Sequence, residues 1–288
     1  MAILNVGSIG SVFRSKVLFH ATAQSMGCPH TPYSMANCWH HSHPHPDSVS
    51  LWEGMRAGAK PQDNNQTKLF GDFPHLHTLF ENPFWSAISH PEWTMEWDEL
   101  ADSIRVGGIA LDGCSGKLTR LLRDRVDWPC LGVHLVLHQT QDTRFFHHRL
   151  WLKDNLAAMV RLCSMQRPMS FVRTEFQDFL FRMISGGHAP KVIMQSCAAE
   201  KFANETLFEF LLRRQWLHGE DQHLALLIWN FRQQLQHELD IGPPQTMGPA
   251  GCGLPHSLRQ KWYRKRSQWM DHPIHLNGVC CEFGDQYA

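Results

Sequence analysis

The stretch that decides the fold class is LGVHLVL, residues 131–137, an apolar run with the pattern of a buried strand. A similar run, GGIAL at residues 107–111, precedes it. Two other segments, WTMEWDELADSI at 93–104 and LWLKDNLAAMVRL at 150–162, place apolar residues three and four apart, which predicts helices. Because strands and helices mix here without the strict alternation of a doubly wound sheet, we expect an α+β fold.

The segments on either side of this central part differ from it in texture. A short strand is predicted at Lys16–Phe19, and residues 27–66, rich in Pro, His, Ser, Asn and Gly, are typical of a loop. We therefore divide the chain into a first domain at 1–200, a helical extension at 201–241 with a possible partner surface, and a linker with a basic, aromatic tail at 242–288.

Composition excludes several classes of protein. The 288 residues include 27 basic and 27 acidic side chains, so any contact with nucleic acid must be local. A content of 43% apolar and 19% charged residues excludes an intrinsically disordered chain, and no apolar run reaches the length of a membrane span. The first residues lack the pattern of an export signal, and the nine cysteines form no disulfide framework, so we expect a cytoplasmic protein with reduced thiols.

A Cys- and His-rich stretch near the start contains the donor atoms of a zinc site. Cys28, His30, Cys38 and His40 follow the spacing CxH…CxH, which is not usual for zinc, so we expect no bound metal. The chain has no HExxH, nucleophile elbow, Walker loop or GxGxxG. These absences leave zinc proteolysis, serine hydrolysis and nucleotide triphosphate hydrolysis without local support.

Five short segments, taken in order, carry a family resemblance. They are VLFHAT at 17–22, Arg56 in WEGMRAGAK, DFPHLHTLFENPFWSAI at 72–88, GGIALDGCSG at 107–116 and RTEF at 173–176. The order resembles that of the DarT group of nucleic-acid-modifying ADP-ribosyltransferases: a strand with a His, an Arg, a D-aromatic…P-x-x-x-A-I segment, a strand ending in D-G and a strand that opens with a catalytic Glu. The resemblance covers roughly the first 200 residues.

The resemblance implies an enzyme that takes NAD as its substrate, built on an ADP-ribosyltransferase-like split β-sheet core with flanking helices and a C-terminal helical extension. It implies that the backbone beside His20 holds the nicotinamide amide while the imidazole bonds a ribose hydroxyl. Thr22, Asp112 and Gly113 are the other cofactor-binding residues that it indicates.

The resemblance also indicates the catalytic residues, Glu175 and Arg56. Breaking the bond between ribose and nicotinamide passes through an oxocarbenium-like state. A carboxylate beside the ribose stabilises that charge and accepts the proton of the acceptor, which are the roles predicted for Glu175. A guanidinium suits the pyrophosphate or a planar base, which are the tasks predicted for Arg56.

A nucleic-acid surface is predicted from basic and aromatic side chains. Trp85 is placed in a groove that holds an unstacked base, and the tail SLRQKWYRKRSQW interleaves cations with aromatics as single strands favour. The tail residues predicted to bind nucleic acid are Arg259, Lys261, Trp262, Arg264 and Arg266.

Together these features predict an NAD-dependent mono-ADP-ribosyltransferase that modifies a base in DNA or RNA, as the toxin of a toxin–antitoxin or antiphage module. The expected partners are a DNA or RNA acceptor and an antitoxin or chaperone, with no membrane. Two alternatives stay open. The segment LF…P from Leu79, with LTRLLRD, LGVHL and FVRTEF, also resembles the effector adaptors of type VI secretion, which are not enzymes. The basic tail alone would suit a nucleic-acid-binding module.

Overall fold

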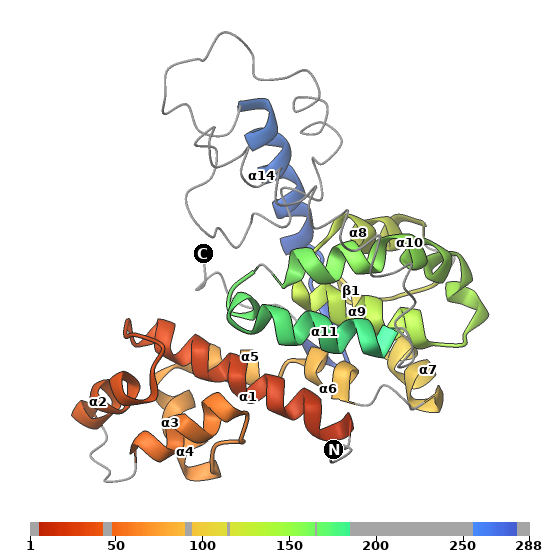
Figure 1. Ribbon diagram of the computed structural model, residues 1–288. Helices are drawn as coiled ribbons and strands as arrows, with labels where there is room; N and C mark the ends of the chain where they lie inside the picture. The colour runs from red at the N-terminus through yellow and green to blue at the C-terminus, as the bar shows by residue number, and fades with distance from the viewer. Residues whose placement is uncertain are drawn as a thin grey trace, which may run out of the picture.

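The computed structural model describes residues 6–42, 48–89, 94–113, 116–164, 166–184 and 256–280, and helices dominate them (Figure 1). The α-helices are α1 (Val6–Ser25), α2 (Pro32–Ser42), α3 (Ser48–Ala57), α4 (Asp63–Asp72), α5 (Pro74–Phe80), α6 (Pro83–Ser89), α7 (Thr94–Ser103), α8 (Gly116–Asp124), α9 (Trp128–Gln139), α10 (Phe146–Cys163), α11 (Arg173–Ile184) and α14 (His256–Met270). Two 3₁₀ turns, η1 (Thr143–Phe145) and η2 (Met169–Val172), and four strands, β1 (Arg105–Val106), β2 (Ile109–Ala110), β3 (Ile274–Leu276) and β4 (Val279–Cys280), complete the set.

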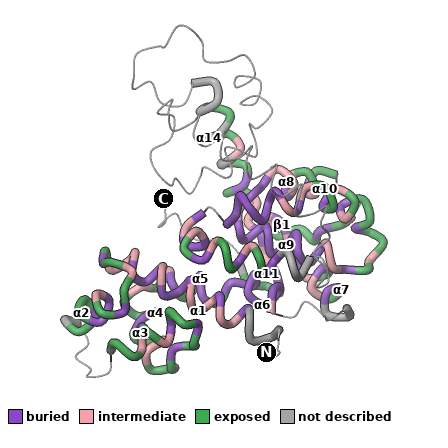
Figure 2. Tube along the Cα trace, viewed as in Figure 1, coloured by how far each residue is buried: buried purple, intermediate pink, exposed green. Residues whose placement is uncertain are grey.

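Helix α9 is the centre of the core. All its residues from Trp128 to Leu137 are buried, because α6, α7, α10 and β3 pack around it (Figure 2). Its start is fixed locally: the Asp127 carboxylate accepts the backbone N–H of Cys130 at 2.8 Å, and Pro129 lies in the first turn. Gly132 lets α6 approach closely, since a Cβ there would lie 3.2 Å from Phe84.

Helix α1 joins two groups of helices. It contacts α3 and α5 of the N-terminal group and α6 and η2 of the central group (Figure 1). Phe13, Val17, Leu18 and Phe19 are buried in these contacts. Each large apolar side chain buried in this way stabilises the fold by about 1.5–3 kcal/mol, so α1 holds the two groups in one core.

A small antiparallel sheet has the strand order β2-β1-β3-β4 and joins distant parts of the chain. Both hairpins close through two-residue turns whose central residues have positive φ: Gly107 and Gly108 between β1 and β2, and Asn277 and Gly278 between β3 and β4. Turns of this kind match the twist of the strands. The two hairpins meet where Arg105 pairs with His275.

Three strand predictions are wrong. Residues 131–137 lie in α9, Lys16–Phe19 in α1, and the RTEF segment at 173–176 opens α11. A helix that is buried on all sides has the same uninterrupted apolar run as a buried strand, which explains the first error. The second rests on three apolar residues, 17–19, a run too short to separate a helix from a strand. In α11 the buried residues Phe176, Phe179 and Leu180 are three and four apart, a helical spacing that four residues alone do not reveal.

Other predictions are confirmed or corrected in part. The helices predicted at 93–104 and 150–162 are confirmed by α7 and α10. Residues 107–111 do contain a strand, β2, but Ile109 is 60% exposed because β2 is an edge strand rather than a buried one. The loop predicted at 27–66 is wrong, since α2, α3 and the start of α4 lie there.

The C-terminal region differs from the predicted tail in its last part. Residues 256–280 form α14 and the β3–β4 hairpin, which pairs with β1 and buries Ile274 and Leu276. The helical extension predicted at 201–241 lies outside the described residues. The α+β class with a split-sheet catalytic core stays a prediction.

Two histidines link α8, α9 and α10 inside the core. The rings of His134 and His148 stack at 5.2 Å, with 3.1 Å between Nδ1 of His134 and Nε2 of His148. The pKa of each is lowered by burial, so both are neutral at pH 7. Because the Leu122 carbonyl can only accept, Nε2–H of His134 donates to it, and Nδ1 of His134 accepts from Nε2–H of His148.

Candidate functional site

A cluster of rings and charges surrounds the C-terminal half of α1. The imidazole of His20 stacks on Phe171 of η2, with 4.8 Å between centroids and 11° between planes. His30 approaches both residues: its ring centroid lies 4.3 Å from that of Phe171, and its Nδ1 lies 2.9 Å from Nδ1 of His20. The three rings therefore form one packed group that is half-buried to exposed.

Charged side chains border these rings. The Lys16 ammonium, one helical turn before His20, forms an ion pair with the Glu175 carboxylate of α11. Arg56, exposed in the last turn of α3, is close enough to His20 to lower its pKa electrostatically. We call Lys16, His20, His30, Arg56, Phe171 and Glu175 the α1 cluster.

The two histidines of the α1 cluster are neutral at pH 7. Burial, and after it electrostatic interactions with His30, Arg56 and Lys16, lower the pKa of His20 to about 4. Burial and the charge of Arg167 lower the pKa of His30. The imidazoles therefore act as hydrogen-bonding groups, and the positive charge of the cluster lies on Lys16 and Arg56.

A turn after α1 brings His30 back to His20. Gly27 has a φ of +63°, its N–H bonds to the carbonyl of Gln24, and the N–H of Cys28 bonds to that of Ala23. This pattern is the Schellman motif, in which glycine in the left-handed region ends a helix. The Thr31 hydroxyl then accepts the N–H of Ser34 and starts α2.

The structure thus places two of the predicted site residues, His20 and Arg56, near one another, and links Glu175 to Lys16, one helical turn before His20, all on helices rather than strands. The role predicted for the backbone beside His20 is wrong, because that backbone lies inside α1, where N–H and C=O groups bond within the helix. Sequence reasoning missed Lys16, whose spacing of four from His20 would have placed both on one helix face.

Thr22 and Gly113 have structural roles instead of the predicted contacts with NAD. The buried Thr22 hydroxyl donates to the carbonyl of Leu18 at 2.7 Å, so it presents no group to a ligand. Asp112 and Gly113 follow β2, and a Cβ at Gly113 would lie 1.9 Å from the carbonyl oxygen of Arg144. Gly113 is therefore required by close packing against η1.

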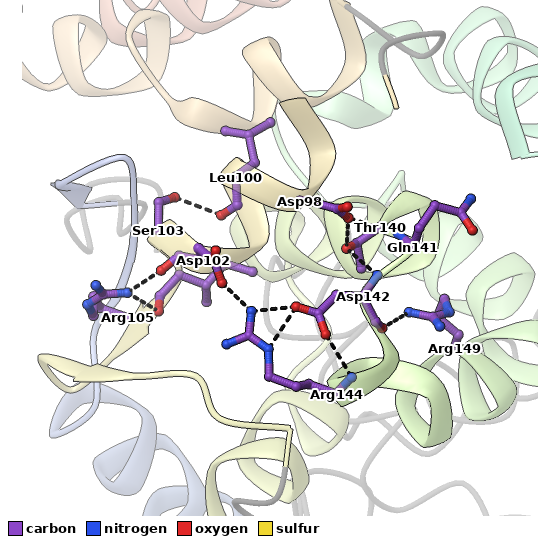
Figure 3. Close-up of polar contacts among 11 residues, drawn as sticks. Asp98, Leu100, Asp102, Ser103, Arg105, Thr140, Gln141, Asp142, Arg144 and Arg149 are labelled. Atoms are coloured by element: carbon purple, nitrogen blue, oxygen red, sulfur yellow. Dashed lines mark hydrogen bonds and ion pairs between the residues drawn. The ribbon is translucent and has the colours of Figure 1, made fainter. Parts of the chain in front are cut away.

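A polar network holds η1 against α7 (Figure 3). Arg144 bonds the carboxylates of Asp102 and Asp142, and Asp98 accepts the Thr140 hydroxyl and the backbone N–H of Gln141. Hydrogen bonds from Arg144 lower the pKa of Asp142. Because each of these carboxylates accepts hydrogen bonds from the turn, the network positions η1, which contacts Gly113.

The residues predicted to bind nucleic acid fall into two groups. Trp85 is buried against Phe84 and Trp128, and its indole N–H donates to the carbonyl of Leu79 at 2.8 Å. Its ring therefore has no free face for a base. Lys261 and Arg264 are exposed on α14, whereas the side chains of Arg259, Trp262 and Arg266 lie outside what the structure describes.

The Cys- and His-rich stretch is divided between two places. His30 turns toward His20, whereas Cys28 faces Cys38. Burial is the main cause that raises the pKa of Cys28 to about 11, and the neighbouring Cys38 thiol is the second. Within the described ranges, no three His, Cys, Asp or Glu side chains are grouped as metal ligands.

Comparison of the chain with protein-family models, with curated proteins and with solved structures finds no match. Among the helices that the structure describes, none combines the length and apolar character needed to cross a bilayer.

The position of Arg56 beside His20 generates the first prediction. Arg56→Gln removes a positive charge that disfavours protonation of His20, so the pKa of His20 will rise from about 4, although burial, the main cause, will keep it below its ordinary value. An NMR titration of the histidine side chains measures this shift. The control Arg120→Gln, an exposed cation on α8, will leave the pKa of His20 unchanged. An unchanged His20 pKa in Arg56→Gln would place Arg56 outside the α1 cluster.

The packing of Gly113 generates the second. Gly113→Ala will lower the free energy of unfolding by about 1–3 kcal/mol, because η1 must move to make room for the methyl group. Urea denaturation gives this value. Gly71→Ala is the matched control: nothing lies within 4 Å of its Cβ, and alanine favours the helix, so its stability will stay equal or rise. Equal stabilities of the two variants would contradict the packing role.

Proposed function

We propose that this protein is an NAD-consuming ADP-ribosyltransferase that binds NAD at the α1 cluster and modifies a base in DNA or RNA. The observation that supports the proposal is that Arg56 lies close enough to His20 to lower its pKa, while Lys16, one turn before His20, pairs with Glu175. These residues come from three segments of the chain that are distant in sequence, and the order of those segments resembles the DarT pattern.

The charges and rings of the α1 cluster suit a dinucleotide. Lys16 and Arg56 supply the positive charge that a pyrophosphate requires. Phe171 is 38% exposed and stacks in parallel on His20, so it offers an aromatic edge or face to a flat ring. Because the helix backbone is already paired, the proposal assigns the ribose and amide contacts to the neutral imidazoles of His20 and His30.

Glu175 is the proposed catalytic group. When the C–N bond to nicotinamide breaks, the electron pair leaves with nicotinamide and positive charge develops on the ribose. The Glu175 carboxylate stabilises this charge and then accepts the proton that the acceptor loses as its bond to the ribose forms. Lys16, the present partner of Glu175, would shift its ammonium to the pyrophosphate when NAD binds.

Helix α14 is the proposed acceptor surface. No acidic residue occurs in the segment HSLRQKWYRKRSQWM, and Lys261, Arg264 and the 58% exposed Tyr263 face solvent. The C-terminal part of α14 is attached to the rest of the fold by the buried side chain of Trp269 and by the ion pair between Lys265 and Asp124 of α8, at 3.0 Å. Cations beside an exposed aromatic ring are the groups that bind single-stranded nucleic acid.

This activity would be toxic to the cell that makes it, so we further propose that an antitoxin or a chaperone controls the protein. Capture of a type VI spike or effector protein in place of an antitoxin would favour the adaptor alternative. Binding of nucleic acid without consumption of NAD would favour the nucleic-acid-binding module, for which the exposed cations of α14 are the specific support.

Glu175→Gln tests the catalytic proposal. With NAD and a mixed-sequence single-stranded oligonucleotide, wild-type protein will release nicotinamide, and the oligonucleotide will gain the mass of one ADP-ribose. The variant will do so about 100- to 1,000-fold more slowly, because the amide cannot stabilise the developing charge. Asp178→Asn, one turn further along α11, removes an exposed carboxylate and will retain the activity. No nicotinamide release by folded wild-type protein would refute the proposal.

Variants of α14 test the acceptor surface. The double variant Lys261→Gln/Arg264→Gln will bind a single-stranded oligonucleotide more weakly. Its binding will also depend less on salt: the slope of log K against log salt will become less negative by about 1.4, since each lost phosphate contact accounts for about 0.7. Fluorescence anisotropy at several salt concentrations measures both. Lys68→Gln/Lys153→Gln makes the same charge change at exposed sites on α4 and α10 and will retain the wild-type slope. Equal slopes in both double variants would exclude α14 as the binding surface.

A further inference from the structure

A hollow lies between α2, α3 and the start of α4, apart from the α1 cluster. Its volume is about 360 Å³, which falls within the range of small-molecule sites. No residue of the α1 cluster lines it. Arg56 is two residues past Gly54, on the other side of α3 from the lining residues Ser50, Leu51 and Gly54.

The floor of the hollow is apolar. Trp39 of α2 and Met55 of α3 are buried there, and Leu51 is half-buried beside them. Gly54 opens the wall, because it lines the hollow without a side chain and only Ala59 lies within 4 Å of where its Cβ would be. The floor therefore offers an apolar surface to one part of a ligand, beside the polar groups of the rim.

The rim is polar, and two of its groups are carboxamides. Gln62 precedes α4 and Asn65 lies in its first turn, where the backbone N–H of Asn65 bonds to the carbonyl of Gln62. Because these residues are three apart at one helix start, both side chains can reach the same ligand edge. Neither carboxamide forms a hydrogen bond with another described residue, so the N–H donors and the oxygen acceptor of each can bind a ligand.

We propose that this hollow, between α2, α3 and α4, binds an adenine-type nucleobase, with its ring over Trp39 and Met55 and its edge against Asn65 and Gln62. A flat heteroaromatic ring matches the apolar floor, and a carboxamide pairs with the amino group and ring nitrogen of adenine through one donor and one acceptor. The proposal goes beyond the transfer of ADP-ribose and does not require NAD to bind at the α1 cluster.

Adenosine is the probe that tests this site. Titration into full-length protein, followed by the NMR signals of the Trp39 indole and the Met55 methyl group, will show saturable shifts with a Kd on the order of 0.1–1 mM. AMP will bind about as tightly, because recognition is of the base. Glu175→Gln will bind adenosine as wild type does, so this result is separable from the outcome for NAD consumption.

Three variants give the proposal its controls. Gly54→Leu fills the hollow and will abolish the shifts, whereas it replaces a helical glycine by a helix-favouring residue and will retain the fold by circular dichroism. Asn65→Leu will weaken adenosine binding at least about tenfold, because the hydrogen bonds between the carboxamide and the adenine edge are lost. Asn64→Leu, the exposed neighbour that does not line the hollow, will bind as wild type does.

The proposal is overturned if adenosine at 10-fold above the expected Kd range causes no shift in folded protein. It is also overturned if Asn65→Leu and Asn64→Leu bind equally well. Indole serves as an apolar ring without the adenine edge, and binding of indole as tight as that of adenosine, unaffected by Asn65→Leu, would show an apolar cavity without base recognition.

Discussion

The burial of α9 from Trp128 to Leu137 is the constraint on which the rest of the structure depends. A helix that is apolar on every side can be stable only if other elements cover every side, and α6, α7, α10 and β3 do so. This requirement fixes the close approach at Gly132 and places the His134–His148 pair where only neutral imidazoles are tolerated. It also explains why a hairpin formed after residue 270 packs against a strand formed near residue 105: β3 supplies part of the cover.

Helix α1 connects this core to the candidate site. Its buried residues Val17, Leu18 and Phe19 pack between the two groups of helices, so the remaining positions Lys16 and His20 have a fixed orientation. The Gly27 turn and η2 then bring His30 and Phe171 to the same place. The cluster is thus a consequence of core packing, because each ring is carried by an element that the core holds in position.

The fold could be predicted where a signal is local and unambiguous. The periodic segments at 93–104 and 150–162 were predicted correctly as helices, since apolar and polar residues alternate there at helical spacing. The run at 131–137 could not be assigned from its own letters, because burial on all sides removes the polar face that separates a helix from a strand. Asp127 followed by Pro129 was the signal that favoured a helix, and Asn277-Gly278 between apolar residues was the signal for the second hairpin.

The candidate site was predictable only in part for a related reason. His20, Arg56 and Glu175 could be chosen from the order of short motifs, but their partners could not, because His30 depends on a helix-ending turn and Phe171 on the docking of η2. The partners change the chemistry. Burial keeps both imidazoles neutral. The positive charges of Lys16 and Arg56, which would attract a phosphate, also oppose protonation of His20. A bound anion would offset these charges and raise the pKa of His20, whereas burial, the main cause of the lowered pKa, would remain.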